Sequence, residues 1–352
     1  MQLKVLELFG GIGACSKALE KLEIDYEIAD YVEIDKYAVK SFNAIHNTNF
    51  EPQDITQWDK DIEVDLIMHG SPCQDFSLAG LQKSGDKGSG TRSSLMWETI
   101  RIVEKLKPKY VIWENVKNLL SKKHRHNFDA YLETMEQLGY TNYYQVLNAK
   151  DYGIPQNRER VFTVSILKYE DTILGKLLVY PIFFEFPQKQ ELKLKLKDLL
   201  EDEVDEKYYL SDVQIKKIET TTYNVGKTRI QKKEWCDTLC ARDWKDPKCV
   251  QVAKLPYFNY ESDGRVYSVS GLSPCLRSKE PNQKIDENDG ILNKTDYKIR
   301  KLTPKECWRL MGFDDEDFDK ASKVNSNAQL YKQAGNSICV PVLESILKEL
   351  LK

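Results

Sequence analysis

The stretch Leu3–Gly13 reads LKVLELFGGIG, an apolar run that ends in a glycine-rich turn, and a helical pattern follows it through Leu22. Glycines at such a turn let the backbone approach a ligand closely. The order of strand and then helix recurs over about the first 165 residues, which indicates a mainly parallel sheet. We therefore predict an α/β fold, Rossmann-like, with helices on both faces of the sheet.

Four more apolar runs have special polar residues where they end or begin. They are Ile28–Ile34 with Glu33-Ile34-Asp35, Val64–Met68 followed by His69–Cys73, Tyr110–Trp113 followed by Glu114-Asn115, and Val161–Ile166 preceded by Gln156–Arg160. In open α/β sheets ligands bind outside the carboxyl ends of the strands. The pattern therefore predicts a binding site at that edge.

The amino-acid composition of the sequence changes at about Phe183. Residues 192–205 are rich in Lys and Glu and are expected to form a solvated helix or a connector. Residues 207–297 are rich in Tyr, Trp, Lys and Arg and predict a strand-and-loop region. We expect a large domain of residues 1–182, completed by residues 325–352, and a small domain with a hinge at residues 183–324. Helix signals return at Thr303-Pro304-Lys305-Glu306, with Gly312 as a stop, and after Pro341.

The bulk composition is that of a globular protein, with 352 residues, 41% hydrophobic and 30% charged. No segment approaches the ~20 apolar residues of a membrane span, and the first residues lack a signal-peptide pattern. We therefore expect a cytoplasmic protein with no membrane contact. We also expect a monomer. The eight cysteines form no Cys-x-x-Cys pair, and no metal site is expected, even at Cys236, Cys240 and Cys249. The net charge of −3 leaves only a local basic face for nucleic acid.

The glycine-rich turn and Glu33 suggest a site for an adenosine-containing ligand. Glu33 lies 20 residues after Gly13, where a carboxylate can bind a ribose hydroxyl pair. Taken alone, these residues fit NAD equally well. Ser16 replaces the third glycine of the dinucleotide pattern, which favours an adenosyl ligand without a pyrophosphate. Asp54 could hold an adenine or could simply cap a helix.

Cys73 is the candidate nucleophile, since it follows Pro72 at the end of a buried strand in a polar neighbourhood. An inert buried cysteine is the commoner role. Residues 78–94 form a glycine-rich basic loop that could close on a phosphate backbone or be a plain surface loop. Glu114 emerges from an apolar strand, where burial favours its neutral form. Arg158 and Arg160 share a face if that segment is extended, and could hold an anion or form a surface ion pair.

Taken in order, these segments resemble the motif series of the cytosine-5 DNA methyltransferases of bacterial and phage type. The motifs that carry the resemblance are residues 8–13 (LFGGIG), 70–77 (GSPCQDFS), 114–116 (ENV), 156–160 (QNRER), 300–313 (RKLTPKECWRLMGF) and 333–337 (QAGNS). Residues 183–297 are unmatched, and the variable target-recognition region of that family falls there. The resemblance implies a class I methyltransferase fold with a small target-recognition domain.

The resemblance also implies the roles of individual residues. S-adenosyl-L-methionine, which leaves as S-adenosyl-L-homocysteine, would be bound by Phe9, Gly11, Gly13, Glu33, Ile34, Asp54, Ile55, Pro72, Leu95, Asn336 and Ser337. Cys73 would attack carbon 6 of a flipped cytosine, with Glu114 at ring N3, Arg160 at the carbonyl oxygen and Arg158 supporting the nucleophile. The residues expected to contact double-stranded DNA are Gln74, Ser77, Gln82, Arg92, Arg242, Lys245 and Arg277.

The resemblance leaves alternatives open. The chain could be a sequence-specific methyltransferase with a separate cognate restriction endonuclease, or a phage or orphan enzyme. It could also methylate tRNA, or be a non-catalytic DNA-binding module. Two positions depart from the family pattern: Cys275 stands where Thr is common, and Ala79 where some relatives have a polar residue. Neither belongs to the catalytic set.

Overall fold

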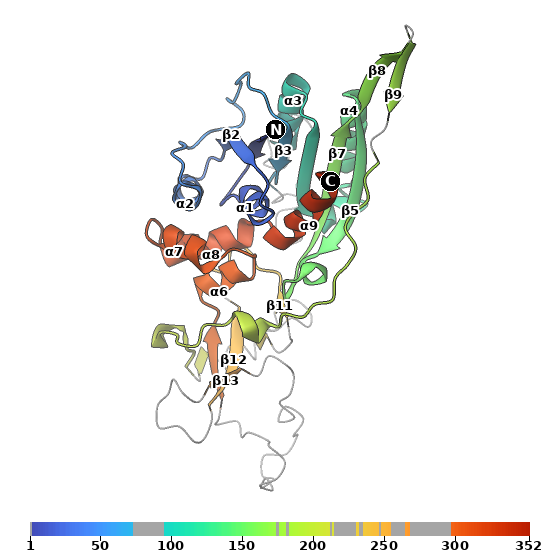
Figure 1. The fold of residues 1–352 in the computed structure, drawn as a ribbon. Helices are drawn as coiled ribbons and strands as arrows, with labels where there is room; N and C mark the ends of the chain where they lie inside the picture. Colours follow the sequence, from blue (N-terminus) through green and yellow to red (C-terminus); the bar gives the residue numbers. More distant parts are fainter. Residues whose placement is uncertain are drawn as a thin grey trace.

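The structure is a computed structural model that describes residues 2–72, 95–173, 176–180, 183–211, 213–214, 230–231, 235–245, 248–254, 265–267 and 297–352. Its centre is a six-stranded sheet of order β2-β1-β3-β4-β7-β5 (Figure 1). The strands are β1 (Leu3–Leu8), β2 (Tyr26–Val32), β3 (Leu66–His69), β4 (Tyr110–Val116), β5 (Tyr140–Asn148) and β7 (Glu159–Leu167). β1 to β4 are parallel and β7 is antiparallel to both of its neighbours. The predicted α/β fold with a mainly parallel sheet is confirmed.

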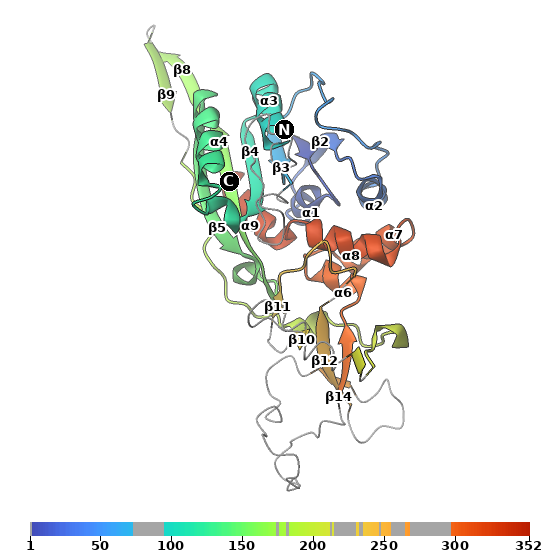
Figure 2. The ribbon, with the colours of Figure 1, turned by 180° about the vertical axis from the view of Figure 1, so that it is seen from behind.

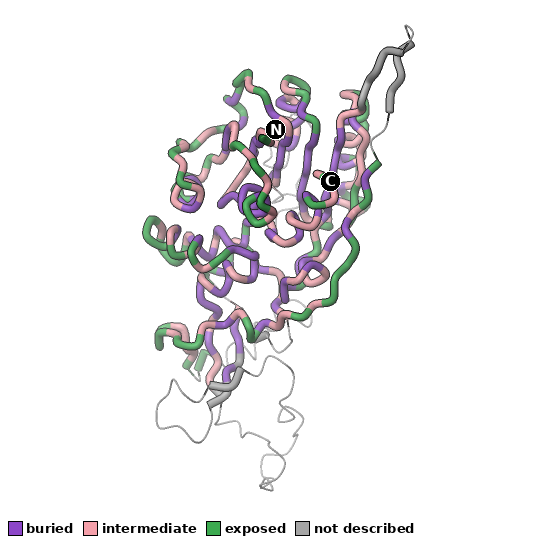
Figure 3. Tube along the Cα trace, in the orientation of Figure 1, coloured by how far each residue is buried: buried purple, intermediate pink, exposed green. Residues whose placement is uncertain are grey.

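Helices cover both faces of this sheet, and a group of three further helices lies below it in Figure 1 (Figures 1 and 2). The helices on the sheet are α1 (Ala14–Lys21), α2 (Lys36–His46), α3 (Met96–Leu106), α4 (Arg125–Gln137) and α9 (Val340–Leu350), and the group below it is α6 (Pro304–Arg309), α7 (Asp315–Ser322) and α8 (Asn327–Asn336). Successive strand residues point to opposite faces, so Val5 joins the core under α1 and α9, while Leu6 joins the core under α3 and α4. Figure 3 shows the buried trace running through the sheet and the C-terminal helices.

A small sheet lies at one end of the molecule and a hairpin projects at the other (Figure 1). The small sheet contains β10 (Ile230–Gln231), β12 (Cys249–Lys254), β13 (Arg265–Tyr267) and β14 (Tyr297–Lys301), and the hairpin is β8 (Tyr169–Ile173) with β9 (Lys176–Tyr180). Two short strands, β6 (Gln156–Asn157) and β11 (Cys236–Asp237), pair in parallel. The expected boundaries between the two domains stay a prediction.

Residues 192–205 form a connector and not a solvated helix. Their regular part is the short 3-10 turn η4 (Leu196–Leu199), and η5 (Glu206–Tyr208) follows it. Leu196 is fully buried and Leu200 nearly so. The charged side chains that surround these two leucines in the sequence hid their contribution to the core.

No helix among the described residues is long and apolar enough to cross a membrane.

The helix start predicted at Thr303 is present. Thr303 accepts a hydrogen bond from the Glu306 amide at 3.2 Å, and Glu306 accepts one from the Thr303 amide at 2.8 Å. This reciprocal cap satisfies two amides that the helix leaves free. Glu306 also pairs with Arg300 at 2.6 Å, and both side chains are fully buried. Gly312 follows the helix with φ at +85°, a conformation that favours glycine.

Glu7 in β1 is a buried carboxylic acid, only 2% exposed, that the sequence pattern did not reveal. It accepts hydrogen bonds from the Ser16 amide at 2.9 Å and from the Ser16 hydroxyl. Burial raises the pKa of Glu7 to about 7, and the bonds from Ser16 oppose that rise. Ser16, which replaces a glycine of the dinucleotide pattern, thus binds β1 to the start of α1.

We predict that Glu7→Gln changes how stability depends on pH. The unfolded chain ionises at Glu7 near pH 4.5 and the folded chain near pH 7, so ionisation favours unfolding over that interval and the loss is complete above it. The loss amounts to roughly 3 kcal/mol. Melting temperatures measured between about pH 5.5 and pH 8 should therefore fall more for the parent than for Glu7→Gln. The exposed Glu27→Gln in β2 should melt in parallel with the parent, and a pH-independent difference for Glu7→Gln would contradict this account.

Candidate functional site

The register of the sheet brings the ends of four strands together at one edge. Leu8 pairs with both Val32 and His69, and His69 pairs with Trp113. The residues that follow these positions therefore lie next to one another along the edge. They are Phe9, Glu33, Gly70 and Glu114, which we call the strand-end site.

Glu33 connects the first two strand ends. Its carboxylate accepts hydrogen bonds from the Gly11 amide at 3.2 Å and from the Asp35 amide at 2.8 Å. Burial raises its pKa, and these backbone bonds oppose the rise. A Cβ built on Gly11 would meet nothing within 4 Å, whereas one on Gly13 would lie 2.3 Å from His46 Nε2. The turn is therefore open at Gly11 and closely packed at Gly13.

The turn at Asp54 lies beside Glu33, because the Gln53 amide donates to the Glu33 carbonyl at 2.8 Å. Asp54 is exposed and its carboxylate accepts from the Thr56 amide and hydroxyl, both at 2.9 Å, so it shapes a turn and caps no helix. Ile55 is buried, while Ile34 is 68% exposed. An exposed isoleucine at this edge offers an apolar surface to a ligand.

The C-terminal segment reaches the same edge of the sheet. A Cβ built on Gly70 would lie 3.5 Å from Ile338 Cδ1. Asn336 just before it is exposed at the end of α8, and Ser337 is buried. Phe9, Pro72 and Leu95 are partly exposed, and Leu95 immediately precedes α3.

Ser71 is held from two sides by β4. Trp113 Nε1 donates to the Ser71 hydroxyl at 3.0 Å, and Asn115 Nδ2 donates to the Ser71 carbonyl at 3.2 Å. These bonds fix the backbone two residues before Cys73, a role of Trp113 and Asn115 that the sequence pattern did not reveal. Among the predicted site residues, Cys73, Gln74, Ser77, Gln82, Arg92 and Arg277 lie outside the described residues.

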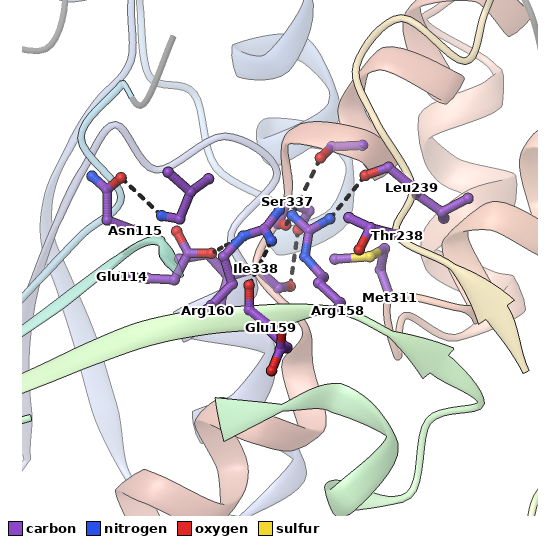
Figure 4. A network of polar contacts seen from close by, with 12 residues as sticks. Glu114, Asn115, Arg158, Glu159, Arg160, Thr238, Leu239, Met311, Ser337 and Ile338 are labelled. Carbon is purple, nitrogen blue, oxygen red and sulfur yellow. Dashed lines mark hydrogen bonds and ion pairs between the residues drawn. The ribbon is translucent and has the colours of Figure 1, made fainter. Parts of the chain in front are cut away.

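Glu114 and Arg160 form an ion pair, with 3.0 Å between Glu114 Oε1 and Arg160 Nε (Figure 4). Glu114 is 9% exposed, and its Oε2 would lie 3.8 Å from a Cβ on Gly70. Nothing in the sequence pairs these two side chains. In the structure they form one polar unit beside the residues that lead to Cys73.

Arg158 is buried at 3% exposure and binds three backbone carbonyls. Its guanidinium donates to Leu239 at 3.0 Å, to Gly335 at 3.3 Å and to Ser337 at 2.7 Å. Burial and then the nearby Arg160 lower its pKa to about 10. Figure 4 shows both guanidinium groups on the same side of the chain, but only Arg160 reaches Glu114. Arg158 therefore clamps segments together, and neither alternative for it, an anion site or a surface ion pair, describes its contacts.

Residues 235–245 pack between the Gln156–Arg158 motif and α8. Gln156 Oε1 accepts from the Leu239 amide at 3.2 Å, and a Cβ on Gly335 would lie 2.2 Å from the backbone of Cys240. Only glycine leaves room for this approach. Arg242 and Lys245 are exposed on the turn that follows. No cluster of three metal-binding side chains occurs within the described part of the chain.

Comparisons with known proteins agree with one another. The family model for C-5 cytosine-specific DNA methylase matches residues 3–352. The type II methyltransferase M2.ScrFI of Lactococcus lactis subsp. cremoris is 36% identical over 99% of both chains. The orphan methyltransferase M.SPBetaI of Bacillus phage SPbeta is 34% identical over 99% of this chain and 98% of its own. The structure of the Entamoeba histolytica methyltransferase EhMeth has the same fold, with a TM-score of 0.70 at 18% identity over 100% of this chain and 98% of that one.

We predict that Arg158→Met destabilises the folded chain by roughly 3 kcal/mol or more, because three buried carbonyls lose their donor. Arg125→Met is the matched control, since Arg125 pairs with Asp129 on an exposed face of α4, where a pair contributes below about 1 kcal/mol. Urea unfolding of both variants measures the difference. Equal losses in the two variants would show that Arg158 is no clamp.

Proposed function

The chain belongs to the family of C-5 cytosine-specific DNA methylases, and from that membership we propose the reaction that its own residues carry out. It is a DNA cytosine-5 methyltransferase of the kind found in restriction–modification systems and phages. In our proposal it binds double-stranded DNA, flips one cytosine out of the stack and methylates carbon 5. The observation that carries the proposal is the Glu114–Arg160 pair beside the segment that leads to Cys73.

The residues around the glycine-rich turn and Glu33 fit S-adenosylmethionine. The Glu33 carboxylate suits the two ribose hydroxyls, the open backbone at Gly11 suits the amino-acid portion, and exposed Ile34 suits the adenine face. Asp54, Ile55, Pro72, Leu95, Asn336 and Ser337 complete the proposed set, with Phe9 and Gly13. When bound, S-adenosylmethionine supplies an electrophilic methyl group.

The remaining side chains act on the cytosine. The Cys73 thiolate adds to carbon 6, and Glu114 binds ring N3 and the exocyclic amine while Arg160 binds the carbonyl oxygen. This addition places electron density on carbon 5, which then takes the methyl group. Loss of the carbon 5 proton and expulsion of the thiolate restore the aromatic ring. Covalent catalysis of this kind divides one difficult step into easier ones, and flipping the base costs a few kcal/mol.

Arg158 has a supporting role in this proposal, as the family resemblance implies. Its guanidinium donates to the backbone carbonyls of residues 239, 335 and 337. It positions these segments around Arg160. We further propose that Arg242 and Lys245 contact DNA phosphates, because they are exposed on the turn that Arg158 anchors through Leu239. A cognate endonuclease is a separate protein in this proposal.

The test is methylation of DNA in vitro with methyl-labelled S-adenosylmethionine, with bisulfite sequencing to locate the product. The parent should form 5-methylcytosine in a fixed sequence context, and tRNA offered in parallel should remain unlabelled. Label in tRNA alone would identify an RNA methyltransferase, and DNA binding without any transfer would identify a non-catalytic module. Either result contradicts the proposal.

Glu114→Gln should lower the rate of transfer by about 10²–10⁴-fold, since general acid–base contributions are of that size. Glu159→Gln is its control, because Glu159 lies on the same strand pair but is half-exposed and binds Lys117. Cys73→Ala should form no product while it still melts cooperatively. Full activity in Glu114→Gln would remove Glu114 from the mechanism.

A further inference from the structure

Helix α8 is tied to the start of α2 by a buried glutamine. Gln333 is 6% exposed; its Nε2 donates to the Tyr37 carbonyl at 2.9 Å and its Oε1 accepts from the Ser41 hydroxyl at 3.0 Å. Asn325, before α8, donates to the same carbonyl and the same hydroxyl, both at 2.8 Å. The first turns of α2 are thus held from outside by a distant part of the chain.

A second set of contacts connects α8 to the glycine-rich turn at Gly11. Lys332 binds the Asp35 carboxylate at 2.6 Å, and Asp35 also caps α2 by accepting from the Tyr37 amide. Burial alone would raise the pKa of Asp35, but the bonds from Lys332 and Tyr37 lower it, so the carboxylate stays ionised. The Asp35 amide in turn donates to Glu33 at 2.8 Å, and Glu33 accepts from Gly11. A continuous chain of bonds therefore runs from α8 to the glycine turn.

The end of α8 is also bound to Arg158. The helix ends at Asn336, and the carbonyls of Gly335 and Ser337 on either side of Asn336 accept hydrogen bonds from Arg158. One helix therefore meets the Glu33 segment through its side chains and the Arg158 clamp through its end. A displacement of α8 relative to α2 would change the position of Asn336 relative to the segment that contains Glu33.

We infer that Gln333 is a positioning residue for the methyl donor, acting with Lys332 through Asp35 and Glu33. The inference rests on the proposed function, in which Glu33 binds the ribose. A carboxylate that accepts two hydroxyls must be held closely in place, because bonds of this kind weaken steeply with misalignment. Gln333 meets that requirement without touching the ligand, by fixing the segment 33–37 relative to Asn336.

The test measures the affinity for S-adenosylhomocysteine by calorimetry, which needs no turnover. Gln333→Met keeps the length of the side chain and removes both hydrogen bonds to α2, and should weaken binding about tenfold. Ser41→Ala removes the partner hydroxyl, should weaken binding about threefold, and serves if Gln333→Met does not fold. Tyr331→Phe is the control: Tyr331 lies on α8 as well, is equally buried at 6% and donates to the Leu302 carbonyl, away from α2.

Tyr331→Phe should lower the melting temperature but leave the affinity unchanged. With S-adenosylmethionine as substrate, Gln333→Met should raise KM with kcat within about threefold of the parent. If Gln333→Met and Tyr331→Phe lose affinity alike, or neither does, α8 is a structural helix only and the inference is wrong. If the parent itself fails to bind S-adenosylhomocysteine, the proposed function fails first, and this inference with it.

Discussion

The assembly of the site depends on the hydrogen bonds between the buried guanidinium of Arg158 and three backbone carbonyls. Burying a cation is costly unless hydrogen bonds replace its hydration. Here backbone carbonyls of Leu239, Gly335 and Ser337 accept hydrogen bonds from its two terminal nitrogens, while its Nε has no hydrogen-bond partner among the described residues. Because these three residues belong to two segments that are distant in sequence from Arg158, the three bonds form only when both segments have docked. Folding of the site is thereby coupled to closure of the C-terminal segment onto the sheet.

The clamp gives neighbouring residues their separate roles. Two residues along the chain, Arg160 faces Glu114 and holds it at 3.0 Å beside Gly70. One arginine thus binds the backbone around the site, and the other pairs with a carboxylate. The close approach of Gly335 to Cys240 adds a steric requirement to the electrostatic one, since a side chain there would separate α8 from residues 235–245.

The sequence was most informative where the signal is local. Apolar runs located β1, β3, β4 and β7, and the cap at Thr303 could be predicted because its partners are three residues apart. Because the carboxyl ends of parallel strands meet at the same edge of a sheet, the fold class also indicated that Glu33 and Glu114 lie at one edge. The sequence could not reveal that Glu7 binds Ser16, because an acidic residue in a strand normally indicates exposure.

The hydrogen-bond partners of Arg158 and Gln333 could not be predicted either, because they lie far away in the sequence. Nothing near Arg158 in the sequence signals that its partners are carbonyls 81 to 179 residues away. Backbone carbonyls carry no sequence signature, so the sequence offered only an anion site or a surface ion pair for this arginine, and the resemblance only a role in supporting the nucleophile. Gln333 was read as part of a motif, and its partners in α2 became evident only from the packing of α8. Leu196 and Leu200 were hidden by the charged residues around them.

The most direct test of the account is to trap the reaction on DNA that contains 5-fluorocytosine. Fluorine cannot leave as the proton does, so a nucleophile that has added to carbon 6 stays attached after the methyl transfer. Digestion and mass spectrometry of the trapped complex should find the modified, methylated base on the peptide that contains Cys73, and only when S-adenosylmethionine is present. A methylated cytosine product with no such adduct, or an adduct on another residue, would contradict the account.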